Sequence, residues 1–371
     1  MSPPEQFKGR YVPIISWPVA CQTQWHEAHA EPGLFEKDKP ARHWRPATIK
    51  KTIDGFGHFI SWMIFAGIFD VDGDVVRLVT RKHMTGFIKA MEASKYAPYT
   101  ICSHVQEVYD ASRVMEPTQD WSWLKTAVKK LRSRSRPVRN KLSRLQPAQA
   151  LERLGRSLMH KAETTKNLSF YKRALMFRDG LMIAVLIRRP FRLKNFSSLT
   201  IESNLINHET SASFLFSADE MKGNRPFEVA FPPNYFERLQ IYIAHYRPYL
   251  LSLTHQNDDL TQELNKTGQN KALWISNEGR ALTDHSLRNA IRKRTKAEFA
   301  IDMTPHLFRD ASVTSLIRHA PESAKITRSI LGHTTIDMTN AHYNQARMIE
   351  TSRRHTNLIE SLTDHITQEV S

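Results

Sequence analysis

The stretch Thr304-Pro305-His306-Leu307-Phe308-Arg309, followed by Leu331-Gly332-His333 and then by Tyr343, decides how this chain folds and what it does. Thr304 suits a helix N-cap and Pro305 suits the first helical position. His306 and Arg309 then lie one turn apart on the same face, where both reach an anion near the helix N-terminus. Gly332 suits the end of a preceding helix, and places His333 before a short helix that carries Tyr343.

The residue types in these stretches indicate phosphoryl transfer on DNA. A tyrosine hydroxyl is a poor nucleophile near neutral pH, because its unperturbed pKa is about 10. A chain that uses one needs cationic and proton-handling neighbours. His306, Arg309 and His333 are of the types required.

The overall charge of the chain indicates a polyanionic partner. Lys and Arg number 53 against 37 Asp and Glu, which gives a net charge of +16 and a pI near 9.8. This is the electrostatic signature of a nucleic-acid binder, and the alternative is a ribosome-associated or merely cationic protein. At 371 residues the chain is long enough for two domains.

Cysteine usage and hydropathy favour a cytoplasmic protein without a membrane span. Cys21 and Cys102 are the two cysteines, too few for a disulfide framework and without paired metal-ligand spacing. The apolar run 181–187 is much shorter than the roughly 20 residues that a span needs. The first residues lack a charged-then-apolar signal pattern, so we expect no export and no membrane partner.

The first half of the chain predicts an arm followed by a helical domain. Residues 1–43 are rich in proline and weakly periodic, which indicates an irregular N-terminal arm or extension, or an extended packing segment. From 44 to 133 apolar residues recur at helical spacing, with helices expected over about 48–67, 83–94 and 98–114. A basic linker is expected over 134–146, because the surrounding stretch has no acidic residue. The candidate DNA-backbone contacts there are Lys129, Lys130, Arg132, Arg134, Arg136, Arg139, Lys141 and Arg144.

The second half, 147–371, predicts helices around a small antiparallel sheet. Helices are expected near 147–161, up to Ile187, over 233–247 and after Thr283, which suits an N-cap. Strands are expected over 200–205, 213–217 and 227–231, and a short one over 273–276. The fold class is therefore mainly α with a small antiparallel β-sheet (α+β).

The C-terminal motifs resemble those of the tyrosine recombinases, the phage integrase family. The resemblance rests on His306-Leu-Phe-Arg309 and on the stretch from Ile330 to Tyr343, and it clearly covers about 175–350. It implies an arginine after a buried helix, matched by Arg192, and a lysine on a β-hairpin, matched by Lys222. It also implies that 44–133 is a helical core-binding (SAM-like) domain and that 147–371 is the catalytic domain.

Two departures from the family pattern leave alternatives open. The family usually has Thr-Gly before the first arginine and an acidic residue three positions after it, whereas this chain has Pro190-Phe191 and Asn195. Arg188 and Arg189 are therefore rivals of Arg192. Tyr343 lies one residue later than usual, with His342 in the usual place, and some members with a His-Tyr pair share this offset.

The resemblance implies the roles of the catalytic set. Arg192 and Arg309 bind the nonbridging phosphate oxygens, and Tyr343 attacks phosphorus to form a 3′-phosphotyrosyl bond. The remaining members handle protons and the phosphate: Lys222 protonates the leaving 5′ oxygen, His306 manages the tyrosine proton, and His333 donates to the phosphate. No cofactor or divalent metal is implied. For each residue the alternative is structural: a surface cation, a turn lysine, or a packed His–Tyr pair.

The implied partner is double-stranded DNA with specific recombination sites. The family works as a homotetramer that exchanges strands through a Holliday junction, sometimes with accessory DNA-bending proteins. Its C-terminal stretch, here 346–371, packs in trans on a neighbouring protomer, although packing on its own domain is equally compatible with the sequence. The competing functions are a non-catalytic DNA-binding protein of the same fold and a type IB-like topoisomerase.

Overall fold

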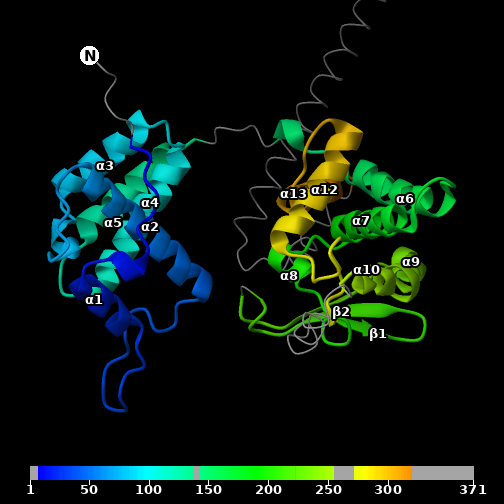
Figure 1. The fold of residues 1–371 in the computed structure, drawn as a ribbon, viewed down its shortest axis with the longest axis horizontal. Coiled ribbons are helices and arrows are strands. Elements are labelled where there is room, and N and C mark those ends of the chain that lie inside the picture. Colours follow the sequence, from blue (N-terminus) through cyan, green and yellow to red (C-terminus); the bar gives the residue numbers. More distant parts are fainter. Residues whose placement is uncertain (1–6, 137–141, 222, 255–270, 320–371) are drawn as a thin grey trace, which may run out of the picture. The chain divides into compact units, whose positions relative to one another are not determined.

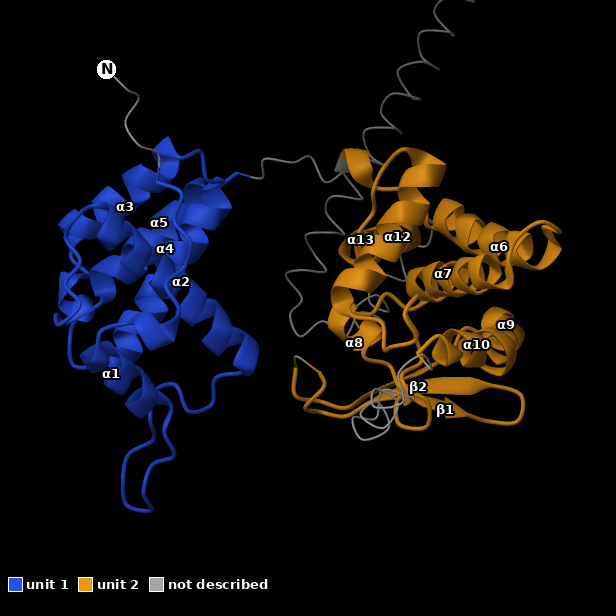
Figure 2. Ribbon diagram, viewed as in Figure 1, with its two compact units in different colours: residues 1–140 blue, residues 141–371 orange. Residues whose placement is uncertain are grey.

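The chain forms two compact units, 1–140 and 141–371 (Figure 2). The computed structural model describes residues 7–136, 142–221, 223–254 and 271–319. Within these ranges the fold is mainly helical with one small antiparallel sheet, which confirms the predicted fold class (Figure 1). In the part of the chain that is described, no helix combines the length and the apolar character needed to cross a membrane.

Unit 1 is a helical bundle with an aromatic core. Its helices are α1 (Val19–His29), α2 (Pro46–Phe65), α3 (Arg81–Ala93), α4 (Pro98–Met115) and α5 (Ser122–Arg134). Phe56 and Phe59 on α2 and Phe87 on α3 are fully buried, and α2 packs along α4. Burial of such large side chains is the main favourable term for this unit. The three helices predicted for it are confirmed to within about two residues at each end.

The prediction of an irregular arm is wrong over 19–29, which form α1. Trp17, Cys21 and Trp25 are buried at helical spacing in the core of unit 1. The one sequence signal for α1 is a short apolar stripe, and the prolines on both sides of this segment obscure its periodicity. The preceding segment is also fixed, because the Val12 amide donates to the Gly57 carbonyl at 3.0 Å.

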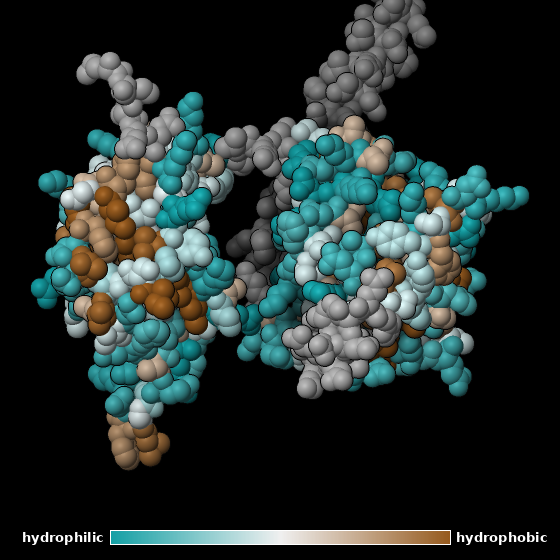
Figure 3. Space-filling view, in the orientation of Figure 1, coloured by the Kyte–Doolittle hydropathy of each residue, from teal (hydrophilic) through white to brown (hydrophobic). Residues whose placement is uncertain are grey.

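A loop between α1 and α2 projects from unit 1 and has an apolar tip (Figures 1 and 3). Leu34 and Phe35 are 90% and 97% exposed. Arg42 bridges the two arms of the loop through Glu31 at 2.7 Å and Asp38 at 3.0 Å. Surface ion pairs are individually weak, so these two add modestly to the backbone hydrogen bonds of the loop, such as the one from the Ala41 amide to the Ala28 carbonyl oxygen at 3.0 Å.

Unit 2 is built around a helical hairpin. Its helices are α6 (Ala148–Thr164), α7 (Phe170–Arg188), α8 (Leu193–Ser197), α9 (Phe236–Ile241), α10 (Arg247–Ser252), α12 (Asp284–Phe299) and α13 (Pro305–His319). Helix α7 is buried on almost every side and contacts α6, α12 and α13. Helices α6 and α7 approach closely because glycines face each other: a Cβ on Gly180 would lie 2.7 Å from the carbonyl oxygen of Gly155.

The sheet of unit 2 has three antiparallel strands in the order β1-β2-β3. They are β1 (Leu205–Asn207), β2 (Ala212–Phe216) and β3 (Phe227–Ala230). The first strand lies later than predicted, and 273–276 is no strand: 272–281 make only isolated bridges, to Thr200 and within the segment. The apolar run there is buried, and its backbone is still hydrogen-bonded: the Leu273 amide donates to the Leu199 carbonyl oxygen at 2.7 Å.

The helix predicted to end at 247 continues to Ser252. A π-helical turn, Tyr242–Tyr246, lies between α9 and α10, and Pro248 occupies the first turn of α10. Proline removes an amide donor and normally ends a helix, whereas a widened π turn shifts the hydrogen-bonding register ahead of it. This local rearrangement lets the helical segment continue past Pro248, beyond its predicted end.

Candidate active site

Arg192 is placed by a proline-ended helix and an aromatic anchor. Helix α7 ends at Arg188, and Pro190 prevents its continuation. Phe191 is buried against the sheet, with its ring 5.0 Å from that of Phe214. Arg192 follows as the N-cap of α8 and is half-buried, and this burial lowers the pKa of its guanidinium.

Arg309 approaches the same region from α13. The helix begins at Pro305, and Phe308 is fully buried, which fixes the orientation of this turn. Arg309 donates a hydrogen bond from Nη1 to the carbonyl oxygen of Pro190. Burial first, and then the positive charge of Arg192, lower the pKa of Arg309 to about 10, while Asp310 opposes the shift.

The two arginines therefore lie close enough to repel each other in a partly desolvated place. Such an arrangement is costly in the free protein, and an anion with several oxygens relieves it. Planar guanidinium forks are well matched to the oxygens of a phosphate. The pair Arg192 and Arg309 thus forms a candidate phosphate site.

The two rivals of Arg192 both make structural contacts. Arg188 forms an ion pair with Glu152 at 2.7 Å. Arg189 donates from Nε to the carbonyl oxygen of Ala230 at 2.8 Å, which ties the end of α7 to β3. The charge that lowers the pKa of Arg309 is that of Arg192, so the geometry favours Arg192 over its two neighbours.

His306 lies on the first turn of α13, one turn before Arg309. Its side chain is exposed, whereas Leu307 is 4% exposed and faces the core. The predicted shared face of His306 and Arg309 is thus compatible with the observed burial pattern. Three of the predicted site residues, Lys222, His333 and Tyr343, lie outside the described residues.

The basic stretch before unit 2 is partly helical and not a linker throughout. Four of its cations lie exposed in the second half of α5, and Arg136 lies just beyond. Arg144 instead pairs with Asp302 at 2.7 Å inside unit 2. Arg139 and Lys141 lie outside the described residues. The exposed cations of α5 are Lys129, Lys130, Arg132 and Arg134.

A buried charge cluster joins α7 to α12, and sequence reasoning did not detect it. Asp179 accepts from Arg178 Nη2 at 2.7 Å and from Arg294 Nε at 2.9 Å. Arg178 also donates to the carbonyl oxygen of Ile275 at 2.6 Å. The available signal was the pair Arg178-Asp179 inside an otherwise apolar helix, because unpaired charges are rarely buried. Among the described residues no group of three or more His, Cys, Asp or Glu could hold a metal.

The paired arginines form a candidate phosphate site, and the comparisons with known proteins give the family of the chain. The sequence profile of the Phage integrase family matches residues 152–350, more than half of the chain. The chain belongs to the phage integrase family, the tyrosine recombinases.

Two solved structures are similar to this chain. One is the XerA recombinase, with 17% identity, covering 85% of this chain and 94% of its own, at a TM-score of 0.38. The other is a lambda integrase(75-356) dimer bound to a COC′ core site, with 13% identity, covering 82% of this chain and 90% of its own, at a TM-score of 0.45. No curated protein sequence matches significantly.

Proposed function

We propose that this protein is a site-specific DNA recombinase that cleaves and rejoins strands through a 3′-phosphotyrosyl intermediate. The observation that carries the proposal is the placement of Arg192 and Arg309 in one partly desolvated region. Family membership supports recombination in general. The chemistry below assigns roles to the chain's own residues.

The reaction exchanges one phosphoester bond for another. The Tyr343 oxygen attacks phosphorus, the bond to the 5′ oxygen breaks, and the tyrosine retains the 3′ phosphate. Arg192 and Arg309 stabilise the negative charge that grows on the nonbridging oxygens, and His333 donates to the same group. His306 accepts or manages the tyrosine proton, and Lys222 protonates the departing 5′ oxygen. Rejoining reverses these steps with another 5′ hydroxyl.

The DNA duplex is the proposed partner of both units. The exposed cations of α5, together with Arg136, Arg139 and Lys141, contact the phosphate backbone. A homotetramer on two recombination sites exchanges strands through a Holliday junction, and residues 346–371 pack in trans on a neighbouring protomer. A DNA substrate also implies a cytoplasmic, nucleoid-associated location.

A nicked suicide substrate tests the proposal. Wild-type protein is expected to form a denaturation-resistant adduct with DNA, and Tyr343→Phe is expected to form none. Because guanidinium groups supply the positive charge, adduct formation should persist in excess chelator. Absence of a wild-type adduct, or equal adduct from the variant, would show a DNA-binding protein without this chemistry. Sequencing the trapped DNA identifies the site and the nucleophile together.

The same assay separates recombination from relaxation. A recombinase requires paired sites and yields recombinant DNA, whereas a type IB-like topoisomerase relaxes any plasmid regardless of sequence. Relaxation without strand exchange between paired sites would therefore replace the proposal with the topoisomerase alternative.

A further inference from the structure

The connection between β2 and β3 is held by the side chain of Glu220. Its carboxylate accepts from the Ser217 amide at 2.8 Å and from Ser217 Oγ at 2.9 Å. It also accepts from Asn204 Nδ2, at 3.0 Å to one oxygen and 3.3 Å to the other. Charge-assisted hydrogen bonds of this kind are stronger than neutral ones. One carboxylate therefore ties the start of the connection to a residue just before β1.

A second anchor holds the main chain of Glu220. Asn195, on α8, is 8% exposed and donates from Nδ2 to the Glu220 carbonyl oxygen at 3.0 Å. Asn195 lies three residues after Arg192, so the helix that begins at Arg192 also grips this connection. An amide donates to a carbonyl oxygen, which a carboxylate at this position does not do.

Asn204 is itself a fixed hub. It is 5% exposed, and its Oδ1 accepts from the Thr200 amide at 3.0 Å and from Thr200 Oγ1 at 2.8 Å. Its Nδ2 also donates to the carbonyl oxygen of Leu215 at 3.0 Å. A buried amide with every group bonded is rigid, and it transmits this rigidity to Glu220.

Packing supports this connection on one side, where Met221 packs against the core of unit 2. An open hollow of about 540 Å³ lies beside it, lined in part by Asn204, Ser217 and Glu220. Apolar packing needs atoms in contact, and a hollow offers none on that side. On the side of the hollow, hydrogen bonds to Glu220 restrain the chain that follows Ser217.

From this arrangement, and resting on the proposed function above, we propose that Glu220 is a positioning residue for the leaving-group acid Lys222. Glu220 precedes Lys222 by two residues in the sequence. The bond from Asn204 to its carboxylate and the bond from Asn195 to its carbonyl oxygen hold the chain two residues before Lys222. Proton transfer requires a donor within hydrogen-bond reach of the departing oxygen, and a displacement of about 1 Å can slow such a step about a hundredfold.

The test uses two DNA substrates that differ in the leaving atom. One is unmodified, and the other carries sulfur in place of the bridging 5′ oxygen at the scissile phosphate. When the P–S bond breaks, the electron pair leaves as a thiolate. This is a weak base, with a thiol pKa of about 8.5, so that leaving group needs no proton. Defects that act through the acid are rescued by sulfur, and defects in phosphate binding or folding are not.

Glu220→Ala is expected to cleave the unmodified substrate about 10 to 100 times more slowly than wild type while binding DNA equally well. On the sulfur substrate it should cleave within about threefold of wild type, as Lys222→Ala should. Glu228→Ala, which removes an exposed carboxylate on β3 of the same hairpin, is the matched control and should leave both rates unchanged.

Other outcomes overturn the inference. If Glu220→Ala cleaves both substrates at the wild-type rate, Glu220 has no role. If it cleaves both substrates slowly, the defect is a general one. Glu220→Gln keeps the shape of the side chain with one acceptor fewer, and it carries the same test if the alanine variant does not fold. If wild type forms no adduct with either substrate, the proposed function fails first. If the sulfur substrate rescues Lys222→Ala but not Glu220→Ala, only the positioning role of Glu220 is rejected.

Discussion

Burial and the positive charge of Arg192 together lower the pKa of Arg309 to about 10. Both groups remain cationic at neutral pH, because even the lowered value lies well above it. The repulsion between them is present in the free protein and is relieved when an anion binds between them. The folded chain thus holds two guanidinium groups in an arrangement that a phosphate favours.

This relationship predicts how variants at Arg192 and Arg189 differ. Arg192→Ala should reduce the rate of adduct formation about 10²- to 10³-fold, because it removes charge stabilisation in the transition state, with a smaller loss of DNA binding. Arg189→Ala removes a hydrogen bond to β3 and should affect stability more than cleavage. Single-turnover cleavage and filter binding measure the two effects. Equal cleavage defects at both positions would show that the wrong arginine has been assigned.

The charge cluster between α7 and α12 gives a stability prediction. Asp179→Asn leaves two arginines facing each other without a counter-charge, which should reduce the free energy of unfolding by about 3–5 kcal/mol. Arg294→Met is the contrasting variant, because Arg178 keeps its partner there and the loss should be clearly smaller. Chemical denaturation followed by tryptophan fluorescence compares them. If Asp179→Asn lowers the free energy of unfolding by no more than Arg294→Met does, solvent already screens the charges of the cluster.

The sequence predicted local features well and long-range contacts poorly. Thr283 caps its helix as expected, accepting from the Ser286 amide, because capping depends on residues a few positions apart. The sequence favoured Arg192 and left Arg188 and Arg189 as rivals, whereas the approach of α13 to Arg192 is a long-range feature that only the fold reveals. The bond from Asn195 to Glu220 joins residues 25 apart, and no local pattern indicates it.

The failure to predict α1 from the sequence has a different physical cause. Its buried residues form a stripe of few positions between prolines, so the periodic signal was short. The helix is stabilised by packing of Trp17 and Trp25 in the core of unit 1, and not by strong propensity. Tertiary burial of this kind cannot be inferred from a short window of sequence.

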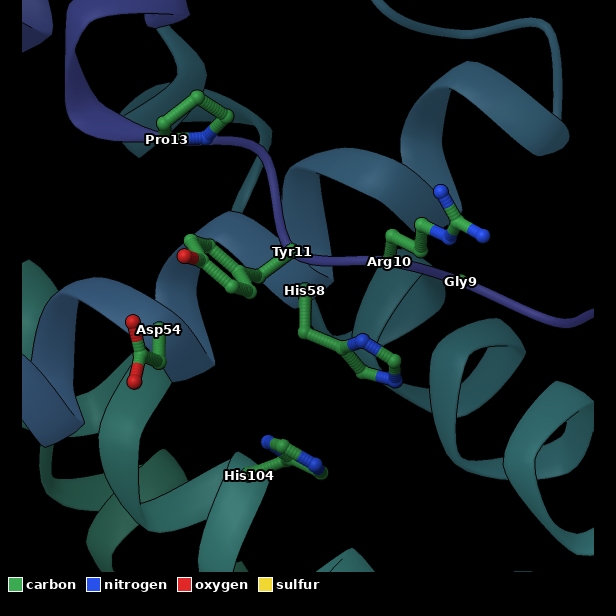
Figure 4. Close-up of a pocket in the computed structure, with 7 residues that line it drawn as sticks. All are labelled: Gly9, Arg10, Tyr11, Pro13, Asp54, His58 and His104. Atoms are coloured by element: carbon green, nitrogen blue, oxygen red, sulfur yellow. The ribbon is translucent and has the colours of Figure 1, made fainter. Parts of the chain in front are cut away.

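The stacked pair His58 and His104 predicts acid sensitivity of unit 1 (Figure 4). Burial first, and then the charge of His104, lower the pKa of His58 to about 4, while Glu107 opposes the shift. Arg10 and Asp54 are the other charged groups that line the adjoining hollow. Because the unfolded pKa is near 6.5, the unfolded state binds the extra proton first as pH falls.

Stability should therefore decline between about pH 6.5 and 4, by up to about 3 kcal/mol from this group. An NMR titration of the His58 imidazole should give a midpoint near pH 4, the lower end of this range. His58→Phe, which suits the surrounding aromatic rings, should flatten the dependence of the unfolding midpoint on pH in this window. A His58 midpoint at its ordinary value would contradict the prediction.

The contact between Gly155 and Gly180 predicts that helix packing limits cleavage as well as stability. A Cβ on Gly180 would lie 2.7 Å from the Gly155 carbonyl oxygen and 2.9 Å from Leu158 Cβ. Alanine favours a helix over glycine by about 1 kcal/mol, whereas overpacking a core costs about 1–3 kcal/mol. Since both neighbours belong to α6 and the carbonyl oxygen cannot rotate away, the clash should prevail, and Gly180→Ala should lower the unfolding midpoint.

The effect should reach the site because α7 leads directly into Arg192. Forcing α6 and α7 apart moves the end of α7 relative to α13, so Gly180→Ala should slow adduct formation about tenfold or more at a temperature where it is still folded. Ser157→Ala on α6 raises helix propensity without a core clash and is the matched control. An unfolding midpoint equal to or above that of wild type would show that the two helices adjust to the methyl group, and the link from their packing to cleavage would be lost.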